Sequence, residues 1–282
     1  MAAAGWAARA VRAAPDAVPE PMRPVRPEFV PDPDATREAM ESLQLAVASA
    51  ATWTDDLGFA VDSVGGADRS LTAPDADPPL VAGVDQAFLD DRAVSAAVVS
   101  RGGTVVERAH AVTDLDIPYV PGLLAFREGA PILAAFAELD CDPDLAVFDG
   151  SGRIHFRQAG LATHVGVTLD VPSVGVAKGL LCGTPDDDPD GRPEGWRTPI
   201  RADADVENAD PGTVIGHALQ SRQYDSSRRI NPLYVSPGHR VGVGTATDLV
   251  ERLCDGYKLP EPTRRADEHA GEVKREYDGR TG

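Results

Sequence analysis

Lysine is the charged residue that this sequence has least of, with 3 Lys against 24 Arg. Acids are plentiful by contrast, with 31 Asp and 14 Glu, and the formal net charge is −18. An acidic, Asp-rich and Lys-poor composition is typical of a protein kept soluble at high salt, so we expect a halophilic protein. At molar salt the Debye length is only about 3 Å, so the net charge does not exclude a nucleic-acid partner.

Cysteines and long apolar runs are also scarce. Cys141, Cys182 and Cys254 lie far apart without a CxxC motif, which excludes a disulfide scaffold and a thiolate zinc site. Such a composition suits a reducing compartment, and we expect a cytoplasmic protein. No stretch approaches the roughly 18 uninterrupted apolar residues of a membrane span, so we expect no membrane partner.

The amino-terminal part of the chain differs in composition from the rest. Seven prolines lie between Pro15 and Pro33, after a start dominated by alanine, and they predict a poorly ordered, flexible extension over residues 1–35. A transit peptide, or a later start at Met22 or Met40, is the alternative. The 42% hydrophobic fraction is enough for a core in the remainder.

The remainder is predicted to be a single catalytic domain over residues 36–268, followed by a carboxy-terminal tail over 269–282. Three apolar segments joined by short turns, at 80–88, 93–100 and 104–112, predict an antiparallel meander. Helices and strands then alternate: we expect helices at 35–52, 123–139, 158–169 and 245–254, strands at 145–150, 171–177, 213–220 and 232–236, and an exposed excursion over 184–212. This order predicts an α/β fold with a mixed sheet flanked by helices.

Three acids stand where catalytic acids are common. Asp85 interrupts an apolar strand, Asp149 ends another, and Glu128 lies at the start of a predicted helix. A carboxylate in or beside an apolar strand is unfavourable unless it is paired or binds a metal. Carboxylates that converge without cysteine indicate a hard cation, Mg²⁺ or alternatively Mn²⁺. Each acid alone could equally be a helix cap, a turn residue or an ion-pair partner.

The segment DIPYVPGLLAFREG (116–129) is the most unusual in the chain. Pro118 and Pro121 bracket Tyr119 and Val120 and fix the backbone on both sides of them. A stiff loop can present its aromatic ring as a wedge that separates stacked bases, or can tuck the ring against the core. The residues alone leave both readings open.

Two cationic candidates follow predicted strands. Lys178, one of only three lysines, comes directly after the strand at 171–177 and is either a functional cation or a solvated helix start. His239 lies in the turn-like segment SPGHRVGV, where a histidine is commonly a surface residue.

The motifs VAGVDQAF, PYVPGLLAFREG, PDLAVFDGSGRIHFRQAGLATHVG, VPSVGVAK, NPLYVSPGHRV and LPEPTRRAD, in this order over about residues 80–268, resemble the endonuclease V family. The resemblance implies a ribonuclease H-like fold and Mg²⁺-dependent hydrolysis of nucleic-acid strands in DNA repair. It implies a nick at the second phosphodiester 3′ to a deaminated base, chiefly hypoxanthine, that leaves 3′-hydroxyl and 5′-phosphate ends. Some members of the family prefer inosine in RNA.

The same resemblance assigns roles to individual residues. It implies that Asp85, Glu128 and Asp149 bind the metal, that Lys178 lies near the scissile phosphate, and that His239 lies beside the metal site. It also implies a strand-separating wedge and a pocket for the flipped base: the wedge is Pro118, Tyr119, Val120 and Pro121, and the pocket is formed by backbone groups around Gly122, Leu124 and Gly150.

Two departures from the family pattern bear on activity. Family members often carry an acid shortly after the histidine, where this chain has only valine and glycine over residues 241–244, and Phe156 replaces a proline that usually follows the residue matched by His155. We still expect catalysis, with nucleic acid containing deaminated bases as the partner, and a monomer. The alternative is a catalytically weak or silent binder of inosine-containing or structured nucleic acid.

Overall fold

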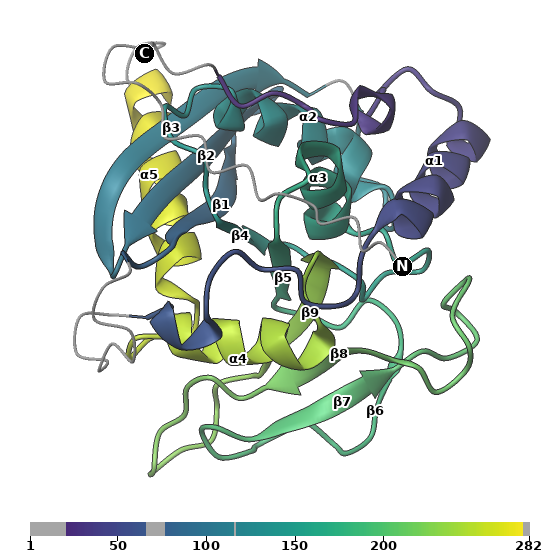
Figure 1. The fold of residues 1–282 in the computed structure, drawn as a ribbon, viewed down its shortest axis with the longest axis vertical. Coiled ribbons are helices and arrows are strands. Elements are labelled where there is room, and N and C mark those ends of the chain that lie inside the picture. Colours follow the sequence, from purple (N-terminus) through teal and green to yellow (C-terminus); the bar gives the residue numbers. More distant parts are fainter. Residues whose placement is uncertain (1–20, 66–76, 116, 279–282) are drawn as a thin grey trace, which may run out of the picture.

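The structure is a computed structural model that describes residues 21–65, 77–115 and 117–278. Its centre is a nine-stranded mixed sheet in the order β3-β2-β1-β4-β5-β9-β8-β7-β6 (Figure 1). The strands are β1 Leu80–Phe88, β2 Arg92–Arg101, β3 Thr104–Asp114, β4 Leu145–Asp149, β5 Ser173–Ala177, β6 Thr184–Pro185, β7 Arg197–Arg201, β8 Val214–Leu219 and β9 Leu233–His239. The predicted meander is confirmed, since β1, β2 and β3 pair antiparallel, whereas β1, β4 and β5 are parallel.

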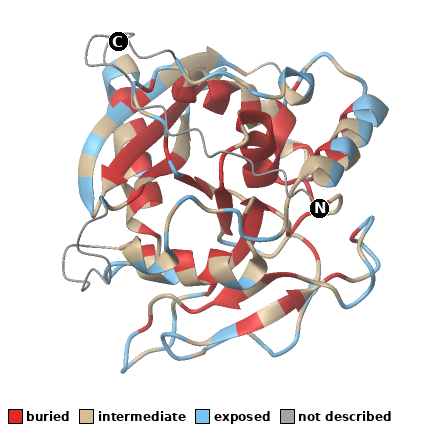
Figure 2. Ribbon diagram, in the orientation of Figure 1, coloured by how far each residue is buried: buried red, intermediate tan, exposed pale blue. Residues whose placement is uncertain are grey.

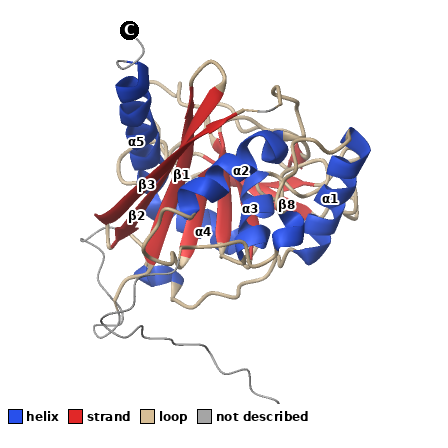
Figure 3. Ribbon diagram, turned by 90° about the horizontal axis from the view of Figure 1, so that it is seen from above, coloured by secondary structure: helices blue, strands red, loops and turns tan. Residues whose placement is uncertain are grey.

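Helices cover both faces of this sheet, which confirms the predicted α/β class. They are α1 Arg37–Ala50, α2 Leu124–Phe136, α3 Leu161–Leu169, α4 Val243–Leu253 and α5 Glu261–Asp278. Figure 3 shows α5 on the opposite side of β1–β3 from α2 and α3. The buried residues are concentrated in the central strands and in α3 (Figure 2).

Strand alternation explains why two cores form. Successive side chains of a strand point to opposite faces. In β4, Ala146 and Phe148 pack with α2 and α3, whereas Leu145 and Val147 pack with α4. A strand that is apolar on both faces is therefore what a sheet covered on both sides requires.

The amino-terminal segment corrects the predicted extension in part. Residues 1–20 lie outside the described residues, but residues 21–35 pack on the domain. The N–H groups of Val25 and Arg26 both donate to the carbonyl of Thr168 at 3.0 Å, and Pro31 packs beside Gly129. Because its backbone donors find partners on α3, this part of the segment belongs to the folded domain.

The carboxy-terminal boundary is also corrected. The predicted tail at 269 begins inside α5, which continues to Asp278. Ala270 and Val273 are buried against Val94 and Ala96 of β2. The second half of α5 is therefore part of the sheet's covering layer.

The predicted exposed excursion over 184–212 contains two further strands. β6 and β7 extend the sheet beyond β8, and Ile200 of β7 is fully buried with Ile154 and Ile215. The excursion therefore has a small core of its own. Among the described residues, no helix is long and apolar enough to cross a membrane.

Gly83 allows α5 to lie directly on β1. A Cβ atom at this position would stand 2.0 Å from the backbone of Pro262, at the start of α5. Only glycine permits such a close backbone approach. The start of α5 is thereby brought over β1, close to the end of the strand that carries Asp85.

Candidate active site

The three predicted acids and the predicted lysine line one pocket of about 310 Å³. Asp85 comes from β1, Asp149 from the last position of β4, and Glu128 from the first turns of α2. Because β1 and β4 are parallel neighbours, their carboxyl-terminal halves meet at the same edge of the sheet. The lining consists of Val84, Asp85, Gln86, Phe88, Glu128, Ile132, Phe148, Asp149, Leu161, Lys178 and Asp267.

Two of these carboxyl groups are held in surroundings that disfavour their ionised form. Burial, and then the charge of Asp149, raise the pKa of Asp85 to about 8, although the N–H of Gln86 donates to Asp85 Oδ1 at 2.7 Å. Burial is also the main reason that the pKa of Glu128 rises to about 7. Removal from water disfavours the ionised form of both groups, and the neighbouring charge of Asp149 adds to this effect.

Lys178 provides the positive charge inside this pocket. Its Nζ donates to Asp149 Oδ2 at 2.5 Å, although the lysine side chain is 54% exposed. Burial lowers the pKa of Lys178, but the hydrogen bond and charge of Asp149 outweigh it, so that the pKa is raised. The ammonium group therefore stays charged at neutral pH and faces both the acids and solvent.

Asp267 is a pocket residue that the sequence reasoning missed. It lies on the exposed side of α5, and its charge acts on both Asp85 and Lys178. The prediction looked for a further acid after His239, whereas the structure supplies one from the motif PTRRAD. That motif was part of the family resemblance, and its final Asp was the signal that could have been used.

The donors of the pocket fit a hard divalent cation. Four carboxylates, from Asp85, Glu128, Asp149 and Asp267, face one ammonium group, so the site is short of positive charge when all are ionised. Oxygen-only donor sets are those that Mg²⁺ and Mn²⁺ prefer. In the described part of the chain, no group of three or more His, Cys, Asp or Glu side chains is close enough together to hold a metal ion as it stands. The fit therefore rests on donor chemistry and charge.

The PYVPG segment forms a tight turn with an outward ring. The N–H of Leu123 donates to the carbonyl of Val120 at 3.0 Å, and Gly122 has φ of +80°. Proline at the second position and glycine with positive φ at the third are the signature of a type II turn. Tyr119 is 63% exposed, whereas Val120 packs towards Phe126 in the core. Of the two readings left open, the exposed ring is the one observed.

This turn leads directly into α2 and leaves backbone donors free. α2 begins at Leu124 without a side-chain cap. Within the described residues, neither the N–H of Gly122 nor that of Leu124 donates to an acceptor. Gly150, directly after β4, is fixed by its own N–H, which donates to the carbonyl of Val176 at 2.9 Å, and it packs against Leu161 of the pocket.

His239 does not lie beside the acids, which corrects the predicted position. It is the last residue of β9 and pairs with Ser173, whereas Asp149 pairs with Val176 of the same strand β5. Three residues along a strand span about 10 Å, so His239 lies towards the other end of the sheet. It is 1% exposed rather than a surface residue.

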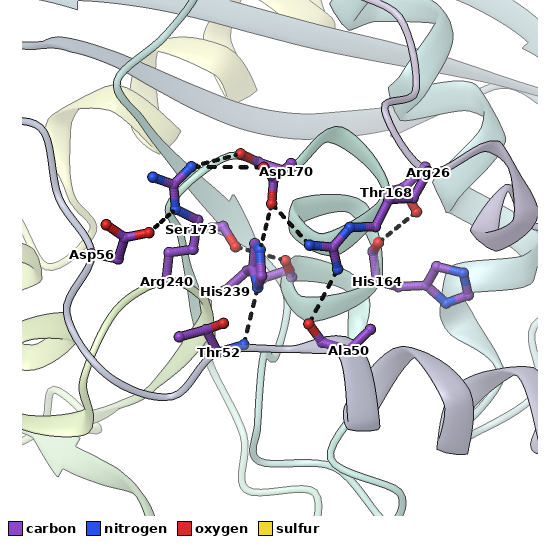
Figure 4. A network of polar contacts seen from close by, with 11 residues as sticks. Arg26, Ala50, Thr52, Asp56, His164, Thr168, Asp170, Ser173, His239 and Arg240 are labelled. Carbon is purple, nitrogen blue, oxygen red and sulfur yellow. Dashed lines mark hydrogen bonds and ion pairs between the residues drawn. The ribbon is translucent and has the colours of Figure 1, made fainter. Parts of the chain in front are cut away.

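His239 instead ties three segments together (Figure 4). Its Nδ1 accepts from the N–H of Thr52 at 3.1 Å, so Nε2 carries the proton and donates to Asp170 Oδ1 at 3.0 Å. Burial lowers the pKa of His239, which keeps the ring neutral in this arrangement. Asp170 also pairs with Arg26 and Arg240, so the network joins the amino-terminal segment to α3 and β9.

The two departures from the family pattern lie outside the acidic pocket. Gly242 follows His239 at the same end of the sheet, and its N–H donates to Asp55 Oδ1 at 2.7 Å. Gly244 has open space around it. Phe156 packs beside Gly122, where a Cβ on the glycine would stand 3.1 Å from its ring. Neither position removes an acid from the pocket.

The sheet order, the helices on both faces and the acids at the carboxyl edge define a protein of the ribonuclease H-like class. A model of the family described as Endonuclease V matches residues 66–268. The chain therefore belongs to the Endonuclease V family, a family of endonucleases.

Curated relatives named Endonuclease V cover nearly the whole chain. The protein of Haloarcula marismortui is 59% identical over 268 residues, which span 90% of this chain and 98% of the relative. The protein of Halobacterium salinarum is 55% identical over 264 residues, which span 89% of this chain and 100% of the relative.

Solved structures agree with the fold. The Endonuclease V of Streptomyces avermitilis matches with a TM-score of 0.70 at 34% identity, covering 92% of this chain and 99% of that one. The Endonuclease V of Ciona intestinalis, solved with a 24mer DNA containing an inosine followed by a ribo-adenosine, matches with a TM-score of 0.65 at 23% identity. That match covers 85% of this chain and 98% of the other, and shows a shared fold.

Proposed function

We propose that this chain is a Mg²⁺-dependent endonuclease of DNA repair that nicks DNA at the second phosphodiester 3′ to a deaminated base, chiefly hypoxanthine. The products are 3′-hydroxyl and 5′-phosphate ends. The observation that carries the proposal is the pocket in which carboxylates from β1, α2, β4 and α5 face Lys178. The family membership and the inosine-containing DNA bound to the Ciona protein support the choice of substrate.

The residues of the pocket have distinct tasks in this reaction. Asp85, Glu128, Asp149 and Asp267 would hold the cation, which when bound polarises the phosphate and lowers the pKa of water for in-line attack. Asp85 and Glu128 must release their protons to bind it, because their pKa values are raised. Lys178 is placed to stabilise the negative charge that develops on the phosphate oxygens.

The turn before α2 would select the base. A base extruded from the duplex needs a pocket with hydrogen-bond groups aimed at its edge. The free N–H groups of Gly122 and Leu124 are donors that suit the carbonyl oxygen of hypoxanthine. Tyr119 would occupy the space left in the stack, with Pro118, Val120 and Pro121 holding it outward.

A basic loop lies at the same edge of the sheet as the acids. Ala177, directly before Lys178, pairs with Tyr234, and the neighbouring Leu233 pairs with Leu219 at the end of β8. The loop that follows β8 carries Arg222, Arg228 and Arg229 against one acid, Asp225. These charges would contact the phosphates of the strand.

The silent-binder alternative has no observation in its favour, because the valine–glycine stretch that suggested it lies away from the pocket. The experiment is a nicking assay on matched DNA and RNA duplexes, each with one inosine, with Mg²⁺ and with EDTA. We expect one cut at the second phosphodiester 3′ to inosine, only with Mg²⁺. Tight binding without any product would overturn the proposal in favour of the silent binder.

A further inference from the structure

The carbonyl of Gly122 is held by two buried side chains. Gln44 Nε2 donates to it at 2.8 Å, and His155 Nε2 contacts it at 3.1 Å. Gln44 is fully buried and belongs to α1, which lies outside the residues 66–268 that match the family model. A buried polar side chain from outside the matched region thus contacts the turn that carries the wedge.

Neighbouring contacts fix the direction of both hydrogen bonds. Arg157 Nη1 donates to Gln44 Oε1 at 3.2 Å, so the amide nitrogen of Gln44 is the atom that faces Gly122. The N–H of Arg157 donates to His155 Nδ1 at 3.1 Å, so His155 carries its proton on Nε2. Both side chains are therefore donors to the same carbonyl oxygen.

Arg157 in turn is anchored by acids on both sides. Its guanidinium pairs with Glu41 of α1 at 2.9 Å and with Glu207 at 3.4 Å, and its side chain is only 13% exposed. The amide of Gln44 therefore cannot turn over without leaving a buried guanidinium short of an acceptor. The largely buried guanidinium is therefore held from several sides, and such a connected network is rigid.

This arrangement fixes the peptide plane between Gly122 and Leu123. The N–H of that plane closes the turn on the carbonyl of Val120, while its carbonyl is held by Gln44 and His155. The free N–H groups of Gly122 and Leu124 lie on the two adjacent peptide planes. Holding the central plane restricts the directions of these two N–H groups, because each neighbouring plane is joined to it through a single Cα atom.

We propose that Gln44 is a positioning residue for base selection: by donating to the Gly122 carbonyl, it orients the Gly122 and Leu124 N–H groups towards a hypoxanthine ring. This inference rests on the proposed function, because it presumes that the turn meets the base. Gln44 does not touch the substrate and acts through the backbone of the turn.

Two variants separate donation from packing. Gln44→Glu keeps an acceptor for Arg157 but has no N–H for Gly122, and Gln44→Met keeps the length of the side chain without its polar atoms. Val47→Ala is the matched control, because Val47 is fully buried on the same helix and packs with Ala159 and Val167 in an apolar cluster that includes no residue of the turn.

The measurement is the ratio of affinities for an inosine duplex and the identical unmodified duplex, in an Asp149→Asn background with Mg²⁺. Circular dichroism gives the Tm of each variant. We expect both Gln44 variants to lower the ratio by about tenfold or more, with affinity for the unmodified duplex unchanged. Val47→Ala should lower the Tm and leave the ratio unchanged.

The inference is overturned if Gln44→Glu lowers the affinity ratio less than Gln44→Met does, or if Val47→Ala lowers it as much as the Gln44 variants do. Packing alone would then explain the loss of selectivity. If the Asp149→Asn parent itself binds the two duplexes equally, the proposed function fails and this inference fails with it. A selective parent with an equally selective Gln44→Glu variant overturns the inference alone.

Discussion

Asp85 illustrates at the scale of one residue how the pocket disfavours the ionised form of a carboxyl group. Its pKa is about 8 in the folded protein, against an ordinary value of 3.8. The folded state therefore keeps a proton that the unfolded state has lost, so the stability of the metal-free protein falls as pH rises from about 4 to about 8.

Asp85→Asn removes this titration. We expect the variant to be more stable than the wild type in EDTA, by a margin that grows by about 1–3 kcal/mol between pH 5 and pH 8. Urea unfolding at the two pH values measures it, with Glu268→Gln on the exposed face of α5 as the control. A margin independent of pH would show that Asp85 is not buried against a like charge.

Asp267 gives a second test at this scale. Asp267→Asn should lower the nicking rate by about tenfold or more, because one of four carboxylates that balance a cation is lost. The residue is exposed, so the Tm should change little. Glu268→Gln, one position further along α5, should nick at the wild-type rate. Equal rates for the two variants would remove Asp267 from the site.

Single residues also show which parts of the site could be predicted from the sequence and which could not. Asp85, Glu128, Asp149 and Lys178 could be singled out because a charged residue within or directly after an apolar strand, or at the start of a helix, is conspicuous, and the resemblance then gave them roles. The place of His239 could not be found, because it depends on the antiparallel register of β9 on β5, which puts the end of β9 at the start of β5. Gln44 carries no motif at all, and its contact with Gly122 spans 78 positions.

At the scale of elements, the turn between β3 and α2 has a proposed mechanical role, the separation of the two strands of the duplex. Tyr119→Ala should weaken the preference for duplex inosine more than it slows cleavage of inosine in a single strand. The ring would hold an opened duplex apart, and stacking on an aromatic side chain contributes about 1–3 kcal/mol per base. Paired rate measurements on the two substrates test this. An equal loss on both would show that the ring is not a wedge.

Three elements escaped prediction for physical reasons: α5, β7 and β6, which has only two residues. Beyond its first turn, α5 buries only Ala266, Ala270 and Val273 among charged neighbours, so its i, i+4, i+7 stripe is short and built from small residues. Pro199 lies in the middle of β7, and proline argues against a strand in sequence. The other helices and strands were predictable because their apolar runs are long and bounded by turn residues.

At the scale of the whole molecule, a protein with a net charge of −18 has to bind DNA, which is itself a polyanion. We expect nicking to persist or to peak at molar KCl. At low salt the acidic surface repels DNA and also itself, and molar salt screens both over about 3 Å. Screening weakens phosphate contacts as well. We expect the screening of repulsion to outweigh the weakening of phosphate contacts, because the net charge is so negative.

The corresponding measurement is the nicking rate on an inosine duplex from about 0.1 to about 3 M KCl, with folding followed by circular dichroism. A folded enzyme whose rate falls monotonically over this range would refute halophilic adaptation.

The most direct test of the acidic pocket as the catalytic centre compares the wild type with Asp149→Asn on one labelled inosine duplex with Mg²⁺, beside the same duplex without inosine. We expect the wild type to nick only the inosine duplex. The variant should bind that duplex but lose nicking by about a hundredfold or more, because an amide is a poor ligand for a hard cation and frees Lys178 from its partner. A variant that nicks within about tenfold of the wild type would contradict the assignment of the pocket.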